Sequence, residues 1–167
     1  MKEIEITPDG FKHERPEQRR AREKALILLS YSDYTEKRMR EKLTSSGFSD
    51  DIVSEVLAYL TERKYINESA FLRSFAEYCV EKKLYGRKKL LAVINEKGFD
   101  RELLENELDG VLGEFDFVDI CKRQIAKAKR TDLGDRAARE KLIASLARRG
   151  FSLSEIKEAL IQVMRGE

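Results

Sequence analysis

Three stretches of the sequence decide the fold: MREKLTSSGF at residues 39–48, LLAVINEKGF at 90–99 and LIASLARRGF at 142–151. Each ends in a Gly-Phe pair, and the pairs recur at intervals of about 51 residues, which is typical of a repeat architecture. Aliphatic residues stand four and eight positions before each glycine, so they share one face of a helix. The glycine stands where a helix ends in a left-handed residue, and the phenylalanine after it can fold back onto the apolar face.

A further helical pattern follows each Gly-Phe pair. Ser49, Asp100 and Ser152 stand at the N-cap of this next helix, and Ser152 with Glu155 matches a capping box. The apolar residues that follow recur at helical spacing: Ile52, Val56, Leu57 and Leu60; Leu103, Leu104, Leu108 and Val111; Ile156, Leu160, Val163 and Met164. These patterns predict helices over residues 51–63, 101–112 and 153–165.

A third helical pattern lies upstream of each pair, over residues 17–31, 68–84 and 116–130. The sequence therefore predicts an all-α fold of three tandem three-helix repeats, about nine helices in total. We place the repeats at residues 17–67, 68–115 and 116–167. Because one repeat is too small to bury a good core alone, we expect the repeats to stack into an elongated, curved array. Residues 1–16 are predicted to form a short N-terminal arm, in which residues 3–7 alternate like one short strand.

The composition excludes several classes of protein. With 38% charged and 41% hydrophobic residues, the chain is too apolar for wholesale disorder and too polar for a membrane protein. Its longest wholly apolar run, residues 25–29, is far too short to span a bilayer. The N-terminus lacks the apolar core of a signal peptide. We expect a cytoplasmic monomer with no membrane partner and no small-molecule substrate.

The inventory of reactive side chains is poor. The chain has one histidine, His13, and its glycines match no phosphate-binding loop. Without clustered cysteine and histidine there is no zinc motif. Cys79 and Cys121 both fall within apolar helical patterns, which indicates reduced core residues rather than a disulfide. We therefore expect no catalytic residue, no metal site and no cofactor, and a binding or regulatory role is favoured over an enzyme.

Several stretches between residue 21 and the C-terminus share the pattern of one known family. They lie at residues 25–29, 34–35, 43–48, 60–68, 86–90 and 97–99. On these residues the chain resembles the RecX family, regulators of the bacterial recombinase RecA, whose patterns "kL..kGf", "L...gyldD" and "G...I...L..kG" they match. The chain departs from the family at Asn67-Glu68, where an acidic pair is usual, and at Lys82-Lys83, where an arginine is frequent.

The resemblance implies a non-enzymatic regulator, mainly an inhibitor, whose partner is the RecA filament. Members of the family lie along the groove of the filament that RecA forms on single-stranded DNA. They restrain filament growth, ATP hydrolysis, strand exchange and the coprotease activity that triggers the SOS response. The resemblance therefore implies a role in recombination and DNA repair through protein–protein interaction. Weak contact with DNA itself has also been proposed for the family.

Basic clusters are the candidate contacts with that partner. The net charge is only +2, but the excess of cations lies in the last repeat. A cation at the start of a helix opposes the helix dipole, so the cluster at residues 87–89 calls for another explanation, whereas cations before Gly150 suit a helix end. The candidate partner-binding residues are Arg87, Lys88, Lys89, Lys127, Lys129, Arg130, Arg136, Arg139, Arg148 and Arg149.

Two alternatives stay open at this point. Three-helix units with a tight turn resemble helix-turn-helix modules, so the chain could bind DNA directly. The predicted third helices carry many acids and no array of Arg, Asn and Gln, which disfavours groove reading. The other alternative is a generic scaffold for helical or peptide partners. Aromatic residues can also stack on bases, but the same place of Phe48, Phe99 and Phe151 in every repeat favours core packing.

Overall fold

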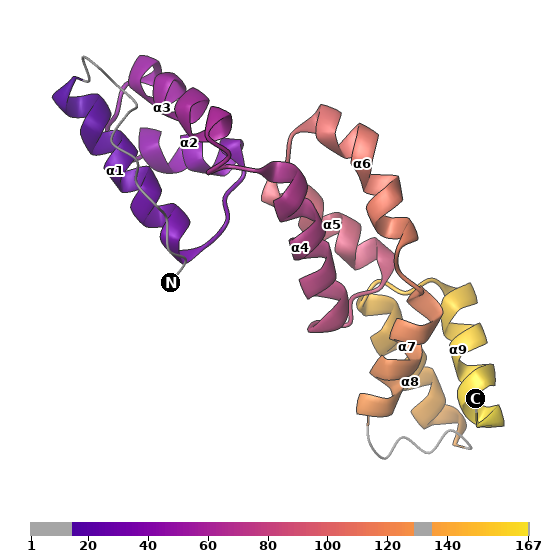
Figure 1. Cartoon of the computed structure of the whole chain (residues 1–167). Coiled ribbons are helices and arrows are strands. Elements are labelled where there is room, and N and C mark those ends of the chain that lie inside the picture. The colour runs from indigo at the N-terminus through magenta and orange to yellow at the C-terminus, as the bar shows by residue number, and fades with distance from the viewer. Residues whose placement is uncertain (1–14, 129–134, 167) are drawn as a thin grey trace. The chain divides into compact units, whose positions relative to one another are not determined.

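The computed structural model describes residues 15–128 and 135–166, and these residues contain helices and no strand. The prediction of an all-α fold is confirmed for this part of the chain (Figure 1). The predicted strand at residues 3–7 and nearly all of the predicted arm lie outside the described residues. The helices are α1 (Pro16–Tyr31), α2 (Glu36–Thr44), α3 (Asp50–Glu62), α4 (Glu68–Glu81), α5 (Arg87–Lys97), α6 (Arg101–Gly113), α7 (Phe117–Lys127), α8 (Arg136–Arg148) and α9 (Leu153–Arg165).

The Gly-Phe pairs end α2, α5 and α8 as predicted. Gly47, Gly98 and Gly150 have φ values of 89°, 74° and 92°, a left-handed conformation that glycine adopts at little cost. After α8, the Gly150 N–H donates to the Ala147 carbonyl at 3.0 Å and the Phe151 N–H donates to the Leu146 carbonyl at 3.3 Å. These two bonds form a Schellman motif, which satisfies carbonyls that the helix itself leaves unpaired.

The predicted helix starts are mostly confirmed. Ser152 and Glu155 form the predicted capping box, and the Asp100 carboxylate accepts from the Leu103 N–H at 3.0 Å. Ser49 does stand at the N-cap of α3, but its hydroxyl makes no capping hydrogen bond within the described residues. Helix α1 starts at Pro16, one residue earlier than predicted, because a proline at the first helical position loses no hydrogen bond.

The described residues fall into two compact units. Unit 1 consists of the residues up to Leu72 and of Lys97–Leu104, and unit 2 consists of Arg73–Glu96 and the residues from Glu105 onward.

No helix in the described part of the chain has both the length and the hydropathy needed to cross a bilayer. The elongated, curved arrangement of the repeats stays a prediction.

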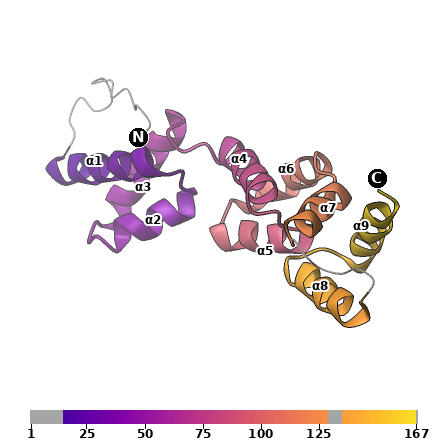
Figure 2. The ribbon, with the colours of Figure 1, turned by 90° about the horizontal axis from the view of Figure 1, so that it is seen from below.

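Unit 1 is built around the core that α1, α2 and α3 enclose (Figures 1 and 2). Met39 and Leu43 on α2 are fully buried, as the spacing before Gly47 predicts. Ala21 and Ala25 of α1 are also fully buried, and their small side chains let neighbouring helices approach closely. Phe48 packs against this core but is only partly buried.

Unit 2 contains the contact between α7 and α9, its most extensive helix pair. Cys121 and Ile156, from these two helices, are buried. Phe151, which precedes α9, is 2% exposed, so its predicted core position is confirmed. Met164 continues the apolar spacing that predicts this helix, but its side chain is 64% exposed. Met164 lies in the last turn of α9, beyond Leu160, the last buried residue of this helix.

Two helices of the described residues end on a left-handed residue that is not glycine: Lys64 after α3 and Leu84 after α4. Lys64 follows α3 with a φ of 59°, and the Tyr65 N–H beside it donates to the Leu60 carbonyl at 2.8 Å. A side chain in this conformation costs about 1 kcal/mol relative to glycine. We therefore expect Lys64→Gly to raise the free energy of unfolding by about 0.5–1 kcal/mol in urea denaturation.

The neighbouring residue supplies the control for this prediction. Arg63 has a φ of −81°, where glycine has no steric advantage. Arg63→Gly is expected to lower the free energy of unfolding, through the larger entropy of the unfolded chain and the loss of the contact between the Arg63 guanidinium and the Tyr59 ring, 5.6 Å to the centroid. A stabilisation by both substitutions, or by neither, would contradict the assignment of strain to Lys64.

Candidate partner-binding surface

The start of α5 and the end of α8 meet in unit 2, where Figure 2 shows the two helices as neighbours. The Gly86 N–H donates to the Arg149 carbonyl at 2.9 Å, and the Lys88 N–H donates to the Gly150 carbonyl at 3.0 Å. A Cβ on Gly86 would overlap the backbone of Gly150, and a Cβ on Gly150 would overlap that of Lys89. The two glycines thus allow backbone to touch backbone, and two predicted basic clusters come together.

Four of the predicted contact residues have structural partners. The Arg87 guanidinium lies 4.7 Å from the centroid of the Phe117 ring, which explains a cation at the start of α5. Arg149 donates from its guanidinium to the Lys83 carbonyl at 2.9 Å. Arg136 pairs with Glu140 one turn along α8 at 2.9 Å. The half-buried Arg139 also has an interaction partner. These cations contribute to the fold of unit 2, which leaves less of their charge for a partner.

Three other candidates are exposed and uncompensated. The side chains of Lys88, Lys89 and Arg148 make no hydrogen bond or ion pair with any residue that the structure describes. They flank the contact between Gly86 and Gly150, so we call them the α5–α8 basic surface. Lys127 is exposed at the end of α7. Lys129 and Arg130 lie outside the described residues.

Sequence reasoning missed Lys83 as a neighbour of this surface. Its carbonyl accepts the hydrogen bond from Arg149, and its ammonium lies 5.5 Å from the centroid of the Tyr78 ring. The signal was present in the sequence, since Lys82-Lys83 stands where the family pattern favours arginine. Spacing along the chain does not reveal that residue 83 lies beside residue 149.

The described residues contain no group of three or more His, Cys, Asp or Glu that could hold a metal ion. Cys79 and Cys121 are buried, as predicted. Burial raises the pKa of the Cys121 thiol to about 12, with a smaller contribution from the charge of Glu155. Because only a thiolate is a good nucleophile, this cysteine is inert at neutral pH.

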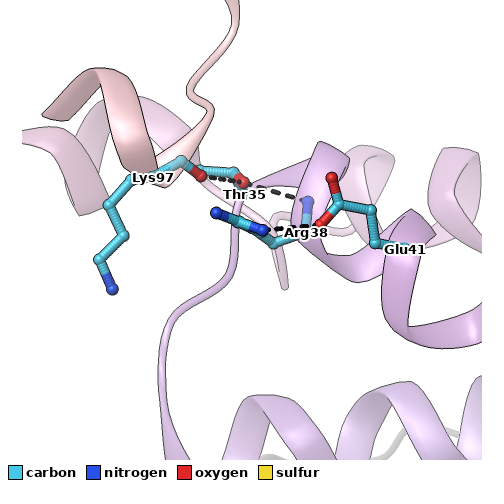
Figure 3. A network of polar contacts seen from close by, with 4 residues as sticks. All are labelled: Thr35, Arg38, Glu41 and Lys97. Atoms are coloured by element: carbon cyan, nitrogen blue, oxygen red, sulfur yellow. Dashed lines mark hydrogen bonds and ion pairs between the residues drawn. The ribbon is translucent and has the colours of Figure 1, made fainter. Parts of the chain in front are cut away.

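A second polar feature lies in unit 1, at one end of α2. An open groove runs along α2, the end of α3 and residues 98–103, and its lining carries both signs of charge. Figure 3 shows hydrogen bonds beside it: the Thr35 hydroxyl donates to the Lys97 carbonyl at 3.1 Å and accepts from the Arg38 N–H at 3.2 Å. Thr35 is 1% exposed. The walls of this groove come from segments far apart in the sequence, so no local pattern predicts it.

Two family models match this chain. The model of the first three-helix domain of RecX matches residues 21–60, and that of the third three-helix domain matches residues 115–160, together just over half of the chain. The chain belongs to the RecX family. Membership in RecX makes it one of a family of regulatory proteins, and the family predicted from the sequence is confirmed.

Relatives named regulatory protein RecX are similar over most of the chain. The RecX of Caldanaerobacter subterraneus is 27% identical over 158 residues, which cover 93% of this chain and 78% of that protein. A Streptococcus pneumoniae RecX (strain Hungary19A-6) is 32% identical over 138 residues, which cover 81% of this chain. The match spans only 52% of the length of that streptococcal protein.

Solved RecX structures share the fold. The crystal structure of RecX from Lactobacillus salivarius superposes with a TM-score of 0.72 at 24% identity, covering 87% of this chain and 96% of that one. A second crystal structure of a regulatory protein RecX gives a TM-score of 0.71 at 23% identity, over 84% and 71% of the two chains. At these identities, the similarity demonstrates the all-α fold with its three-helix domains.

Proposed function

We propose that this chain regulates RecA, mainly as an inhibitor, by binding along the groove of the filament that RecA forms on single-stranded DNA. It would restrain filament growth, ATP hydrolysis, strand exchange and the coprotease activity behind the SOS response. Its place of action would be the cytoplasm, and its mode of action binding rather than catalysis. Membership in RecX carries the proposal, because family models match domains near both ends of the chain.

The α5–α8 basic surface is the part of the chain that we assign to this contact. Three cations lie on this surface, Lys88, Lys89 and Arg148, and no described acidic side chain pairs with them. Uncompensated charges of one sign speed the encounter with a surface of the opposite sign and select against partners of like charge. The surface therefore fits an acidic patch on a protein, at modest ionic strength.

Inhibition of the ATPase activity of RecA tests the proposal. With RecA assembled on single-stranded DNA and this protein titrated in, we expect progressive inhibition at less than one molecule per RecA. Inhibition that persists with saturating DNA would indicate action on the filament. A loss of inhibition in excess DNA, with tight and strongly salt-dependent DNA binding, would favour a direct DNA-binding protein. No effect on RecA in any condition would favour a scaffold for other partners.

Reversing the charge of the surface tests its assignment. We expect K88E/K89E/R148E to raise the concentration needed for half-maximal inhibition at least about tenfold, because three attractive contacts become repulsive. The fold should persist, since all three side chains are exposed, and the two acids that suit the start of α5 offset the one that opposes the dipole at the end of α8. The readout is the same ATPase titration, with circular dichroism as a check of helix content.

A second triple variant gives the matched control. K24E/K42E/K157E makes the same change in net charge at exposed lysines of α1, α2 and α9. We expect it to shift half-maximal inhibition by about twofold or less, since none of these lysines belongs to the α5–α8 basic surface and salt screens their exposed charges. Equal losses in both triple variants would mean that net charge, and not the α5–α8 basic surface, matters.

A further inference from the structure

Two contacts join the second helices of successive repeats. One lies in unit 2, between α5 and α8, and the other lies in unit 1, between α2 and the last residue of α5. In unit 2 the end of α8 meets the start of α5 through backbone hydrogen bonds, with Gly86 against Gly150. In unit 1 the end of α5 meets the start of α2, where the Thr35 hydroxyl donates to the Lys97 carbonyl. A Cβ on Gly98 would meet only the flexible side chain of Lys37, at 3.0 Å. The contact in unit 1 is therefore made by side chains, whereas the contact in unit 2 is made by backbone groups.

One carboxylate completes the contact in unit 1. The Glu68 Oε1 accepts from the Glu36 N–H at 2.7 Å, and its Oε2 accepts from the Asp100 N–H at 2.7 Å. The Glu36 amide belongs to the first turn of α2, and the Asp100 amide immediately precedes α6. Both are helix N-terminal amides, which carry partial positive charge and favour an anion. A single side chain thus joins the starts of two helices whose residues lie far apart in the sequence.

Both of these bonds end on a carboxylate acceptor. Hydrogen bonds to an ionised acceptor are roughly twice as strong as neutral ones. Around them, the Phe71 and Phe99 rings pack with centroids 5.1 Å apart, and the Lys97 ammonium lies 5.9 Å from the Phe71 centroid. A Cβ on Gly98 would lie nearest to a side chain, whereas a Cβ on Gly150 in unit 2 would overlap the backbone of Lys89. The segments in unit 1 are therefore held together by side chains, with Glu68 supplying the bonds to a charged acceptor and Phe99 the apolar packing.

We propose that Glu68 is a latch that holds residues 97–104 on the first repeat, and that this contact opens locally while the contact between Gly86 and Gly150 stays closed. Glu68 is a positioning residue, acting through the two amides it binds. This proposal does not depend on RecA as the partner.

Amide hydrogen exchange on the full chain tests the latch. Glu68→Gln keeps the shape of the side chain, but the amide has one acceptor oxygen, and its NH₂ group would face the second N–H. We expect the Asp100 and Glu36 amides to exchange about 10- to 100-fold faster in this variant, which is the loss of one or two charge-assisted bonds. The Gly86 and Lys88 amides should keep their protection.

The capping box of α9 offers a matched control. Glu155 accepts from the Ser152 N–H at 2.6 Å, so Glu155→Gln removes the same kind of bond without touching the latch. It should speed exchange at Ser152 and leave Asp100 and Glu36 unchanged. The latch would be disproved by exchange at Asp100 and Glu36 within twofold of the parent protein in Glu68→Gln. A uniform acceleration of all amides of unit 1 would disprove it too, since that is general destabilisation.

Amide exchange in the unsubstituted protein also tests the latch, and this test does not depend on the folding of a variant. The latch predicts that Asp100 and Glu36 exchange through local opening, at least about tenfold faster than Gly86 and Lys88 after correction for intrinsic rates. Equal protection of the two pairs would overturn the proposal. Neither measurement involves RecA, so a failure of the latch is distinguishable from a failure of the proposed function.

Discussion

Replacing Gly150 with alanine is expected to lower the free energy of unfolding by about 3 kcal/mol, the sum of two costs. The first is the left-handed backbone, with a φ of 92°, which costs a residue with a Cβ about 1 kcal/mol. The second is the overlap of the new Cβ with the backbone of Lys89, where overpacking costs about 1–3 kcal/mol because backbone cannot rotate away. Urea denaturation followed by circular dichroism measures the loss.

Gly47→Ala separates the two costs. Gly47 has nearly the same φ, 89°, but nothing lies within 4 Å of the Cβ that alanine would add. We expect this variant to lose only about 1 kcal/mol, the cost of the conformation alone. The difference between the two variants is the cost of separating α5 from α8. If the variants lost the same free energy, the contact between Gly86 and Gly150 would not exist in solution.

Phe151→Ala is expected to lower the free energy of unfolding by about 3–5 kcal/mol, the usual cost of removing a buried aromatic side chain. Phe151 is 2% exposed and lies in the chain between the end of α8 and the start of α9. Phe48→Ala should cost less, about 1–2 kcal/mol, because Phe48 is only partly buried in unit 1. Thermal and urea denaturation of the two variants make the comparison.

The same pair of variants tests the base-stacking interpretation. A stacking residue is worth about 1–3 kcal/mol per base in affinity for a single strand and contributes little to stability. We expect Phe151→Ala to lose stability, and we expect the folded fraction of each variant to bind single-stranded DNA as the parent does. A variant that kept its stability and lost DNA affinity would instead identify its phenylalanine as a stacking residue.

The sequence by itself determined the elements of this fold. The end of α8 at Gly150, the capping box of Ser152 and Glu155, and the buried face of Met39 and Leu43 were all predictable. The reason is that helix ends depend on the conformations and hydrogen bonds of a few neighbouring residues, and the buried face depends on the helical period. The sequence also carried the patterns by which the RecX family was recognised.

Local rules were less reliable where burial depends on a neighbouring helix. Met164 continues the apolar spacing of α9, yet its side chain is exposed in the last turn of that helix. Spacing along one helix does not show how far the neighbouring helices extend. Ser49 stands at the correct capping position and makes no capping bond to a described residue. In both cases the sequence permits an interaction, and the packing of other segments decides whether it forms.

Only the tertiary structure decided how the charged residues are used. Ten basic residues looked alike in the sequence, but Arg87 lies on the Phe117 ring and Arg149 binds the Lys83 carbonyl, whereas Lys88 stays exposed. The link from Glu68 to two helix starts, each 32 positions away, was equally invisible. A long charged side chain has no preferred partner within its own helix turn, so its role depends on which distant segment the fold brings within reach.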